Sequence, residues 1–368
     1  MKIVICGGGN ISHALAGFLA SNPLNEVSVL TRKPHLWSRE ITVFSQNGTE
    51  EIRSTLRRVT SDDSVIQKAD VVFVSLPCFA RHEVLLKVQK NLPSHALVVV
   101  IPGVGGANFE METLFKNPKV CYFHRTPYVS RIIEYGKSVQ ADKKQYCSVY
   151  FSSNCTTAQR KIIQELNIVE TREFYTPWLL TLSNSNPIIH IARLCEIHHT
   201  QPHEECPLFY AEWGNDASEL AIKMDEELKQ ILQRLNASQE FVPLLTYYES
   251  SDTESLTRKI NSILPLHTIP APMMKQQKYW EIDSTSRYLT EDLPYGTCFI
   301  KFMAQTLGLN SPFLDKSIRT LQKYLNECFV DQNGFLSEET FMKYISPSII
   351  QSILLKYKLK NNLTEFVV

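Results

Sequence analysis

A glycine-rich turn near the start of the sequence limits what this chain can fold into. Residues 2–6 form a short apolar segment that predicts a strand, and the glycines at 7–9 interrupt it. Residues 11–21 then carry apolar side chains at helical spacing. A strand that turns into a helix through Gly-x-Gly-x-x-Ser is typical of a doubly wound α/β sheet, where the helix N-terminus binds a pyrophosphate. The alternative is a glycine turn without a ligand.

The first half of the chain continues this alternation of strand and helix. Residues 26–31 alternate apolar and polar side chains, and residues 70–76 and 96–101 are nearly continuous runs of β-branched and other apolar residues. Such runs suit strands that are covered on both faces by helices. We therefore predict an α/β fold for residues 1–178, a Rossmann domain built on a doubly wound sheet.

The apolar period changes to a helical one in the second half. The repeat predicts a long amphipathic helix carrying Leu220, Met224, Leu228, Ile231 and Leu235. A capping box at residues 251–254 predicts a helix through Ile263, and further helices are expected at 298–307 and 314–329. We predict a mainly helical domain over residues 179–368, with the active site in the cleft between the two domains.

The glycine motif and the end of the second strand suggest how a dinucleotide is held. Gly7 permits the tight turn, Gly9 lets the pyrophosphate approach backbone N–H groups, and Ser12 is small enough to keep helix and strand close. The strand at 70–76 ends at a proline near the expected position of a nicotinamide ring. The expected cofactor contacts are Gly7, Gly9, Asn10, Ile11, Ser12, Thr31, Arg32, Lys33 and Pro77.

The end of the second strand also indicates which dinucleotide binds. Sites that prefer NAD usually place an Asp or Glu there for the ribose hydroxyls. Here the residues are Thr31, Arg32 and Lys33, and the next acidic residue is Glu40. A guanidinium can stack on adenine and bind a 2′-phosphate, so we favour NADP(H) over NAD(H). A solvated basic turn is the alternative interpretation.

The composition gives the chain no net charge that would attract a charged macromolecule. The 38 acidic and 38 basic residues balance, so we expect neither nucleic acid nor membrane as a partner, but small-molecule substrates and a possible homodimer. Nine cysteines with scattered spacing suggest free thiols in a reducing compartment. Since the sequence also enters a strand pattern directly, without a secretory leader, we expect the protein to be cytoplasmic.

Several segments resemble the opine dehydrogenases of the octopine/nopaline group. In chain order they are Cys6-Gly-Gly-Gly-Asn10, Asp70 to Pro77, Pro127-x-x-x-Arg131, Asn186-Pro-Ile-Ile-His190 and Arg287-Tyr-Leu-Thr-Glu-Asp-Leu-Pro294. The last is the most selective, and together the segments span nearly the whole chain. The resemblance implies an NAD(P)H-dependent oxidoreductase that condenses a 2-oxo acid with an amino acid and reduces the resulting imine.

The resemblance also implies roles for individual residues. His190 matches the family's catalytic histidine, a residue type suited to acid–base work near neutral pH. Asp292 matches the carboxylate that orients that histidine, and Arg287 matches an arginine that binds a substrate carboxylate. Each has a plain structural alternative: a hydrogen-bonded core histidine, a capping aspartate and a salt-bridged arginine.

The chain departs from some relatives at His124-Arg125-Thr126-Pro127, where they carry Glu-Thr before Leu-Pro. Loss of that acid argues against a cationic guanidino substrate, whereas Arg125 supplies positive charge that could bind a carboxylate or simply lie at the surface. The amino acid and the 2-oxo acid therefore remain open.

Two other functions fit part of the pattern. One is a two-domain NAD(P)-dependent dehydrogenase that reduces a carbonyl, such as a 2-hydroxy-acid dehydrogenase, and the other is a non-catalytic NADP-sensing protein. The cluster Cys195, His198, His199, His203 and Cys206 invites a metal-binding interpretation, but the adjacent Pro202 and acidic residues favour a loop between helices. We expect no metal.

Overall fold

The computed structural model describes residues 1–45, 47–48 and 51–356. It divides into two compact units, Met1–Leu180 and Thr181–Val368. The boundary predicted from the sequence lies two residues earlier. Within the described ranges, every helix is too short or too polar to cross a bilayer.

The first unit is built on a mostly parallel sheet, as the β-branched runs predict. In the described residues this sheet has eight strands in the order β12-β11-β8-β7-β6-β1-β2-β5, and the pairing of β11 with β8 is antiparallel. The strands are β1 (Lys2–Cys6), β2 (Glu26–Leu30), β5 (Arg58–Thr60), β6 (Val71–Val74), β7 (Leu97–Val100), β8 (Val120–Phe123), β11 (Tyr146–Phe151) and β12 (Glu170–Glu173). The order steps outward from β1 in both directions, which is the doubly wound arrangement and confirms the predicted fold class.

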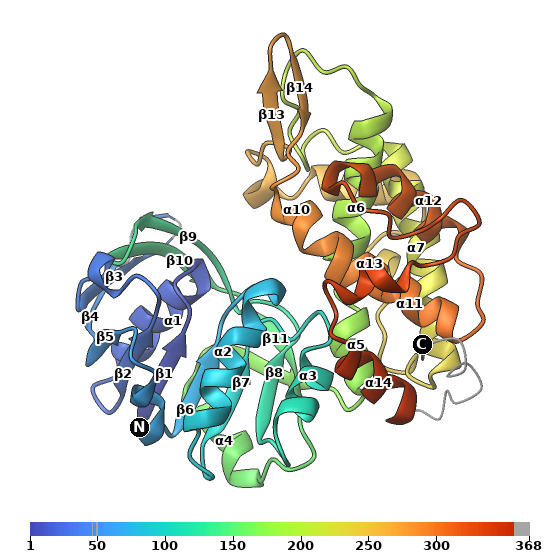
Figure 1. Cartoon of the computed structure of the whole chain (residues 1–368). Helices are drawn as coiled ribbons and strands as arrows, with labels where there is room; N and C mark the ends of the chain where they lie inside the picture. The colour runs from blue at the N-terminus through green and yellow to red at the C-terminus, as the bar shows by residue number, and fades with distance from the viewer. Residues whose placement is uncertain (46, 49–50, 357–368) are drawn as a thin grey trace. The chain divides into compact units, whose positions relative to one another are not determined.

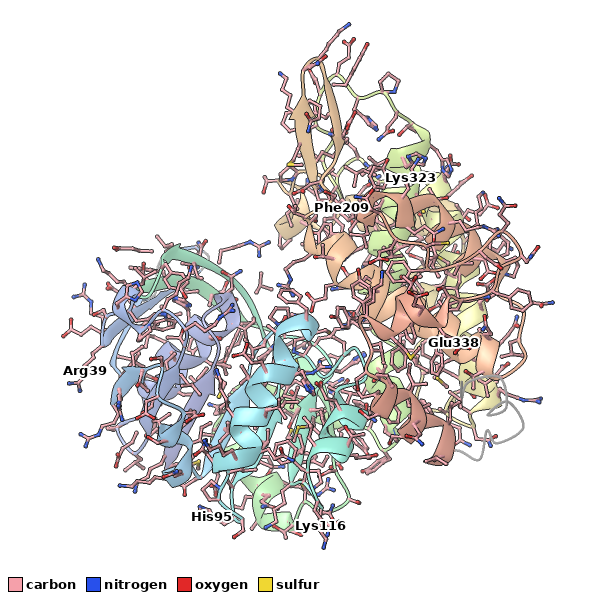
Figure 2. All side chains as sticks on the ribbon, in the orientation of Figure 1. Arg39, His95, Lys116, Phe209, Lys323 and Glu338 are labelled. Carbon is pink, nitrogen blue, oxygen red and sulfur yellow. The ribbon has the colours of Figure 1, made fainter. Side chains whose placement is uncertain are left out.

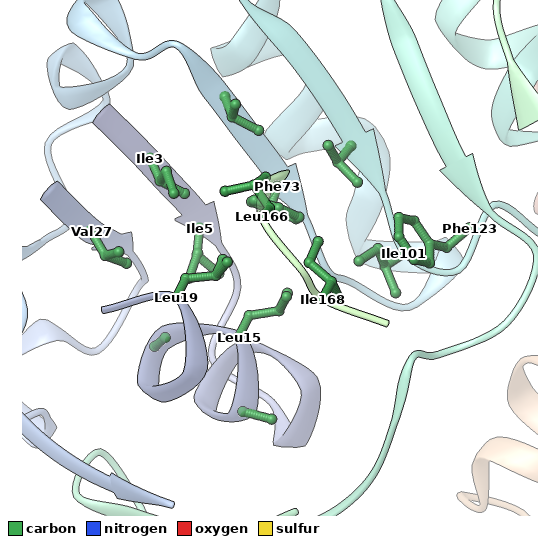
Figure 3. Close-up of a cluster of buried hydrophobic side chains, with 14 of the residues drawn as sticks. Ile3, Ile5, Leu15, Leu19, Val27, Phe73, Ile101, Phe123, Leu166 and Ile168 are labelled. Atoms are coloured by element: carbon green, nitrogen blue, oxygen red, sulfur yellow. The ribbon is translucent and has the colours of Figure 1, made fainter. Parts of the chain in front are cut away.

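Helices cover both faces of this sheet. On one face α1 (Asn10–Ala20) and α4 (Thr157–Glu165) bury Leu15, Leu19 and Ile163 against Ile3, Ile5 and Phe73. Figure 3 shows part of this cluster, with the two leucines of α1 and the side chains of β1 and β6 labelled. On the other face α2 (Cys78–Asn91) and α3 (Ala107–Leu114) lie side by side (Figure 1). Strands β6 and β7 are completely buried because their two faces both contact helices.

A second, smaller sheet packs on the outer side of α1. Its order is β4-β3-β10-β9, and it consists of β3 (Glu40–Phe44), β4 (Glu51–Thr55), β9 (Tyr128–Glu134) and β10 (Ser138–Lys143). Helix α1 approaches it closely at Gly17, where a Cβ atom would come 2.2 Å from Val43. The ring of Phe18 stacks on Tyr128 at 5.0 Å. Helix α1 is therefore packed between two sheets. The sequence patterns did not predict this arrangement.

The second unit is mainly helical, as predicted. Its helices are α5 (Pro177–Leu182, which begins in the first unit), α6 (Asn186–His199), α7 (Asn215–Arg234), α8 (Leu244–Tyr247), α9 (Thr253–Asn261), α10 (Arg287–Thr290), α11 (Cys298–Thr306), α12 (Pro312–Leu321), α13 (Glu338–Met342) and α14 (Pro347–Lys356). Asp252 caps α9 through a capping box with Ser255, one residue later than the box predicted at 251–254, and the helix ends at Asn261 rather than at Ile263. The helix predicted for 314–329 ends earlier, at Leu321, and becomes a 3₁₀ turn (η5, Gln322–Leu325) that closes on Asn326 with positive φ.

Shorter elements complete the chain. A hairpin of β13 (Met273–Gln276) and β14 (Tyr279–Ile282) precedes α10, and a π-helical turn, η4 (Leu293–Thr297), joins α10 to α11. Three 3₁₀ turns, η1 (Pro34–Leu36), η2 (Asp63–Lys68) and η3 (Leu264–Leu266), lie in loops. The turn η4 contacts α6, so the segment around Asp292 is held against the helix that carries His190.

Candidate active site

The turn between β1 and α1 has the close packing that its glycines predict. Gly7 has φ +143°, and a Cβ atom there would lie 2.5 Å from both the Ser12 hydroxyl oxygen and the carbonyl oxygen of Ser75. Ser12 is fully buried, and its hydroxyl faces the same Ser75 carbonyl at 3.5 Å. These contacts bring the first turn of α1 against the carboxyl ends of β1 and β6.

The N-terminus of α1 is open to an anion. Gly9 is its N-cap, no side chain caps the helix, and no acidic residue lies in its first turn. Gly9 is exposed, and a Cβ atom there would meet no described atom within 4 Å. Backbone N–H groups and the helix dipole favour negative charge at such an end. The turn therefore suits the pyrophosphate of a dinucleotide.

Two side chains of α1 tie this turn to the second sheet. The Asn10 side-chain oxygen accepts a hydrogen bond from the backbone N–H of Ile132, at 2.9 Å. His13 bonds to the carbonyl oxygen of Gly9 through Nδ1, at 2.9 Å, and accepts from the backbone N–H of Gly136 through Nε2, at 2.7 Å. The Asn10 amide oxygen therefore connects the first turn of α1 to β9.

Burial makes His13 a neutral structural histidine. Desolvation lowers its pKa from 6.5 to about 4, against a smaller opposing effect of its bond to Gly9. Its ring lies 4.1 Å from the ring of Trp37 and 5.2 Å from that of Tyr135. Sequence reasoning missed this role, since a histidine one position beyond the glycine motif carries no local signal of a partner 123 residues away.

The carboxyl end of β2 meets the same region. A Cβ atom on Gly8 would lie 2.7 Å from the Tyr135 hydroxyl oxygen and 3.1 Å from that of Thr31. Thr31 is buried and accepts from the backbone N–H of Lys33, whereas Lys33 and Arg32 are both exposed. The two basic side chains therefore flank the glycine turn with their charges in solvent.

The loop after β7 is braced by a buried arginine. Arg81 on α2 donates to the carbonyl oxygens of Val104 and Gly105, at 2.7 and 2.9 Å, and pairs with Glu110 on α3 at 2.7 Å. Pro77 is the N-cap residue of the same helix α2 and follows β6 directly. Sequence reasoning placed Pro77 here but did not detect Arg81, which fixes the neighbouring loop at the carboxyl edge of the sheet.

In the second unit, His190 and Asp292 come together although 102 residues separate them. Nδ1 of His190 lies 2.7 Å from Oδ2 of Asp292. An ionised carboxylate only accepts hydrogen bonds, so Nδ1 carries the proton. His190 is 5% exposed on α6, and Asp292 immediately precedes the turn η4. Burial raises the pKa of the Asp292 carboxyl above its ordinary value, while His190 acts in the opposite direction.

Three aromatic residues that the sequence analysis did not single out surround His190. The Tyr210 hydroxyl lies 2.9 Å from Nε2, and Tyr288 covers the ring at a centroid distance of 4.2 Å. Phe209, labelled in Figure 2, contacts the ring edge-on at 5.7 Å. The 208–210 segment is positioned by buried Arg193 of α6, which donates to the carbonyl oxygens of Leu208 and Phe209.

The two expected carboxylate-binding arginines lie in different units. Arg287 begins α10, and both its Nε and its Nη2 donate to Oε2 of Glu291, one helical turn later, while its side chain stays 66% exposed. Arg125 lies between β8 and β9 and is partly buried. Burial, reinforced by the cations of Arg125 and Lys144, lowers the pKa of the adjacent His124 to about 3, so the His124 ring is neutral.

The histidine and cysteine cluster at residues 195–206 has structural partners. The Cys195 thiol bonds to the carbonyl oxygen of Ser317, His198 to the Tyr324 hydroxyl, and His203 to the carbonyl oxygen of Ile197. Within the residues that the structure describes, no group of three or more His, Cys, Asp or Glu side chains is placed to hold a metal ion.

Comparison with known proteins assigns the two halves of the chain separately. Residues 176–325 match the family model described as NAD/NADP octopine/nopaline dehydrogenase, alpha-helical domain. Residues 3–148 match the model of ketopantoate reductase PanE/ApbA. Among curated proteins, the chain is 25% identical to the opine dehydrogenase of Haliotis discus hannai, over 89% of this chain and 91% of the relative. It is also 25% identical to the tauropine dehydrogenase of Arabella iricolor, over 92% and 94%.

The chain is similar to the opine dehydrogenase family over nearly its whole length. Solved structures agree with this family's fold. An octopine dehydrogenase complex with NADH and L-arginine superposes with a TM-score of 0.83 at 23% identity, covering 97% of this chain and 98% of the other. Yersinopine dehydrogenase with NADP⁺ bound gives a TM-score of 0.71 at 11% identity, covering 98% and 99%. The fold of an opine dehydrogenase therefore persists here at low sequence identity.

Proposed function

We propose that this protein is a member of the opine dehydrogenase family that reductively condenses a 2-oxo acid with the amino group of an amino acid, using a nicotinamide dinucleotide. The observation that carries the proposal is the buried His190–Asp292 pair, bonded at 2.7 Å within the unit that matches the octopine/nopaline dehydrogenase model. A protonated histidine held by a carboxylate can protonate the hydroxyl that leaves when an amine and a carbonyl form an imine. Relatives with this activity in their names cover about nine-tenths of the chain.

The glycine turn is the proposed site of the dinucleotide. Gly7 and Gly9 give the turn its shape, and the backbone N–H groups of Asn10, Ile11 and Ser12 would bind the pyrophosphate at the positive end of α1. Pro77, at the carboxyl end of β6, would lie near the nicotinamide. When bound, the dinucleotide supplies the hydride that reduces the imine carbon.

NADP(H) is the proposed preference within this cofactor class. The residues after β2 are Thr31, Arg32 and Lys33, with both cationic side chains exposed. No carboxylate stands there to bind ribose hydroxyls or to repel a 2′-phosphate. Arg32→Ala should raise the Kd for NADPH about tenfold or more and leave that for NADH nearly unchanged. An equal effect on both cofactors would remove the basis for this preference.

His190 is the proposed general acid, and Asp292 is the residue that orients it. The Asp292 carboxylate fixes one proton on Nδ1, so Nε2 is the ring nitrogen that takes part in proton transfer. Because both groups are shielded from solvent, the charge on the imidazolium is stabilised mainly by Asp292. Losing either group should therefore slow the protonation of the departing oxygen.

Arg287 and Arg125 are the proposed carboxylate-binding residues. Arg287 uses two nitrogens for one oxygen of Glu291, and its exposed guanidinium remains accessible to a second carboxylate. Arg125 adds a positive charge next to a neutral His124, which suits an anionic substrate better than a guanidino one. The substrates proposed are therefore an anionic 2-oxo acid and an amino acid without a cationic side chain.

The deciding assay follows oxidation of NADPH and of NADH while 2-oxo acids are combined with a panel of amino acids, with His190→Ala as control. Oxidation that requires both substrates and is lost in the variant supports the proposal. Oxidation with the oxo acid alone would instead indicate a carbonyl reductase, as the ketopantoate reductase match of the first half would allow.

We also propose that the protein acts in the cytoplasm, because all nine of its cysteines are free thiols, which fits a reducing compartment. Fractionation of the cells that express it tests this location. The homodimer stays a prediction, tested by light scattering of the purified protein.

A further inference from the structure

The hydroxyl group of Tyr210 lies at Nε2 of His190, the ring nitrogen that is not bonded to Asp292. Nδ1 of that ring is bonded to Asp292, and Nε2 lies 2.9 Å from the Tyr210 hydroxyl oxygen. The ring face is covered by Tyr288 at 4.2 Å, and its edge by Phe209 at 5.7 Å. Among the described residues, Tyr210 is the polar group bonded to Nε2.

This arrangement decides how a proton can leave His190. Since Asp292 fixes the proton on Nδ1, Nε2 is the nitrogen that exchanges the reacting proton. His190 is only 5% exposed and Tyr210 only 8%, so bulk water does not reach this nitrogen freely. A proton that moves between His190 and a substrate therefore meets the Tyr210 hydroxyl first.

Tyr210 is suited to pass a proton on but not to keep a charge. Burial raises the pKa of its phenol well above the ordinary value, and Tyr288, which is hydrogen-bonded to it, adds to the shift. A free phenolate is therefore unfavourable, and a proton can cross the hydroxyl only if it accepts one proton while donating the other. The pair Arg193 and Phe209 holds the segment in place, since the guanidinium donates to the Phe209 carbonyl at 3.0 Å.

We propose that Tyr210 is a catalytic proton relay between His190 and the substrate. This inference rests on the proposed function. The Nε2–H of imidazolium donates its proton to the Tyr210 oxygen while the Tyr210 O–H donates its own to the hydroxyl of the carbinolamine. The carbon–oxygen bond breaks, its electron pair leaves with water, and the nitrogen lone pair forms the double bond of a protonated imine. His190 ends neutral and Tyr210 ends unchanged.

The second unit offers a matched control. Tyr324 also bonds a histidine, with its hydroxyl 2.8 Å from Nδ1 of His198 in the last turn of α6, whereas the two bonds of the His190 ring go to Asp292 and Tyr210. Tyr210→Phe and Tyr324→Phe therefore each remove one hydroxyl from a tyrosine–histidine pair in the same unit and keep the aromatic ring. Circular dichroism and cofactor affinity report whether each variant is folded.

The test measures kcat, KM and the solvent deuterium isotope effect for the imine-forming substrates. For Tyr210→Phe we expect kcat to fall about a hundredfold with little change in KM, since acid–base groups typically contribute such factors. The wild type should show a curved dependence of kcat on deuterium fraction, because two protons move together, and the variant should lose this curvature. Tyr324→Phe should match the wild type in all three quantities.

Three outcomes would overturn the relay. If the wild type turns over an oxo acid with an amine and Tyr210→Phe does so within about twofold, the relay is wrong while the proposed function stands. If the wild type turns over no such pair, the proposed function itself fails and the relay falls with it. Should Tyr210→Phe not fold, fluorotyrosine at position 210 keeps the ring and lowers the phenol pKa. Unchanged kcat and isotope effect in that protein would equally reject the relay.

Discussion

The backbone N–H of Gly136 donates a hydrogen bond to Nε2 of His13, at 2.7 Å. The neutral ring therefore carries its proton on Nδ1, which donates to the carbonyl oxygen of Gly9. Through this one buried ring, the turn of the β9–β10 hairpin is connected to the N-cap residue of α1. The glycine turn is thus held in place by the hairpin turn at Gly136, which follows His13 by 123 residues.

His13 should make the protein less stable in mild acid. Its folded pKa of about 4 lies below the ordinary 6.5, so the unfolded chain binds the proton first as pH falls. Stability is complete above about pH 6.5 and declines toward pH 4, by about 2 kcal/mol between about pH 7 and pH 5. Urea unfolding of the wild type and of His13→Gln measures it. The variant should be less stable at pH 7 and less sensitive to pH, and equal pH dependence in both proteins would contradict the prediction.

The two outer glycines of the motif should respond differently to alanine. Gly9→Ala should fold normally, because its Cβ meets no described atom, yet weaken dinucleotide binding by about 1–2 kcal/mol. Gly7→Ala should lose about 2–3 kcal/mol of stability, because φ is +143° and Ser75 lies 2.5 Å from the new atom. Calorimetry of unfolding and titration with NADPH separate the effects. Unchanged dinucleotide affinity in Gly9→Ala would argue against this turn as the cofactor site.

Asp292→Asn should keep the shape of the pair and lose its charge. An amide nitrogen facing Nδ1 favours the other tautomer of His190, so the imidazolium loses both its orientation and its stabilisation. We expect kcat about 10²- to 10⁴-fold lower with cofactor affinity unchanged. Steady-state kinetics together with NADPH titration check this, and near-normal kcat would assign Asp292 a purely structural role.

Arg287→Ala separates substrate binding from the salt bridge. The guanidinium is largely exposed but the Glu291 carboxylate is buried, so removing the guanidinium should lower the unfolding free energy by about 1–3 kcal/mol. If Arg287 also binds a substrate carboxylate, KM for the 2-oxo acid should rise at least about tenfold. Glu291→Gln is the control that removes the pair and keeps the guanidinium. An unchanged KM for the 2-oxo acid in Arg287→Ala would mean that Arg287 serves only its salt bridge with Glu291.

Local patterns predicted β1, β2, β6 and β7, four of the eight strands in the main sheet as the structure describes it. Strands β6 and β7 are runs of apolar, mostly β-branched residues, Val71–Val74 and Leu97–Val100, that suit burial on both faces. The turn at Gly7 and Gly9 is likewise encoded by neighbouring residues. The sheet of β3, β4, β9 and β10 was not predicted because its strands are half-exposed and mix apolar with polar residues, and because β3 and β10 pair across a long stretch of sequence.

The partners of the site residues were harder to predict than the residues themselves. The i, i+4 spacing of Arg287 and Glu291 does signal their pair, but the spacing alone does not exclude a second role. Tyr210 lies in an irregular segment between two helices, where no periodicity indicates which way a side chain points. Its contact with His190 depends on Arg193 holding that segment, which only the tertiary structure shows.

The long connections within the first unit have a consequence for the order of folding. Asn10 and Ile132 meet across 122 residues, and β12, at the sheet edge, ends at Glu173. During synthesis, the glycine turn therefore emerges long before the hairpin that braces it. Bringing such distant residues together costs conformational entropy before their contacts stabilise the fold, and this cost slows folding. A ligand that recognises only the braced turn binds after this closure, so it should slow unfolding without speeding folding.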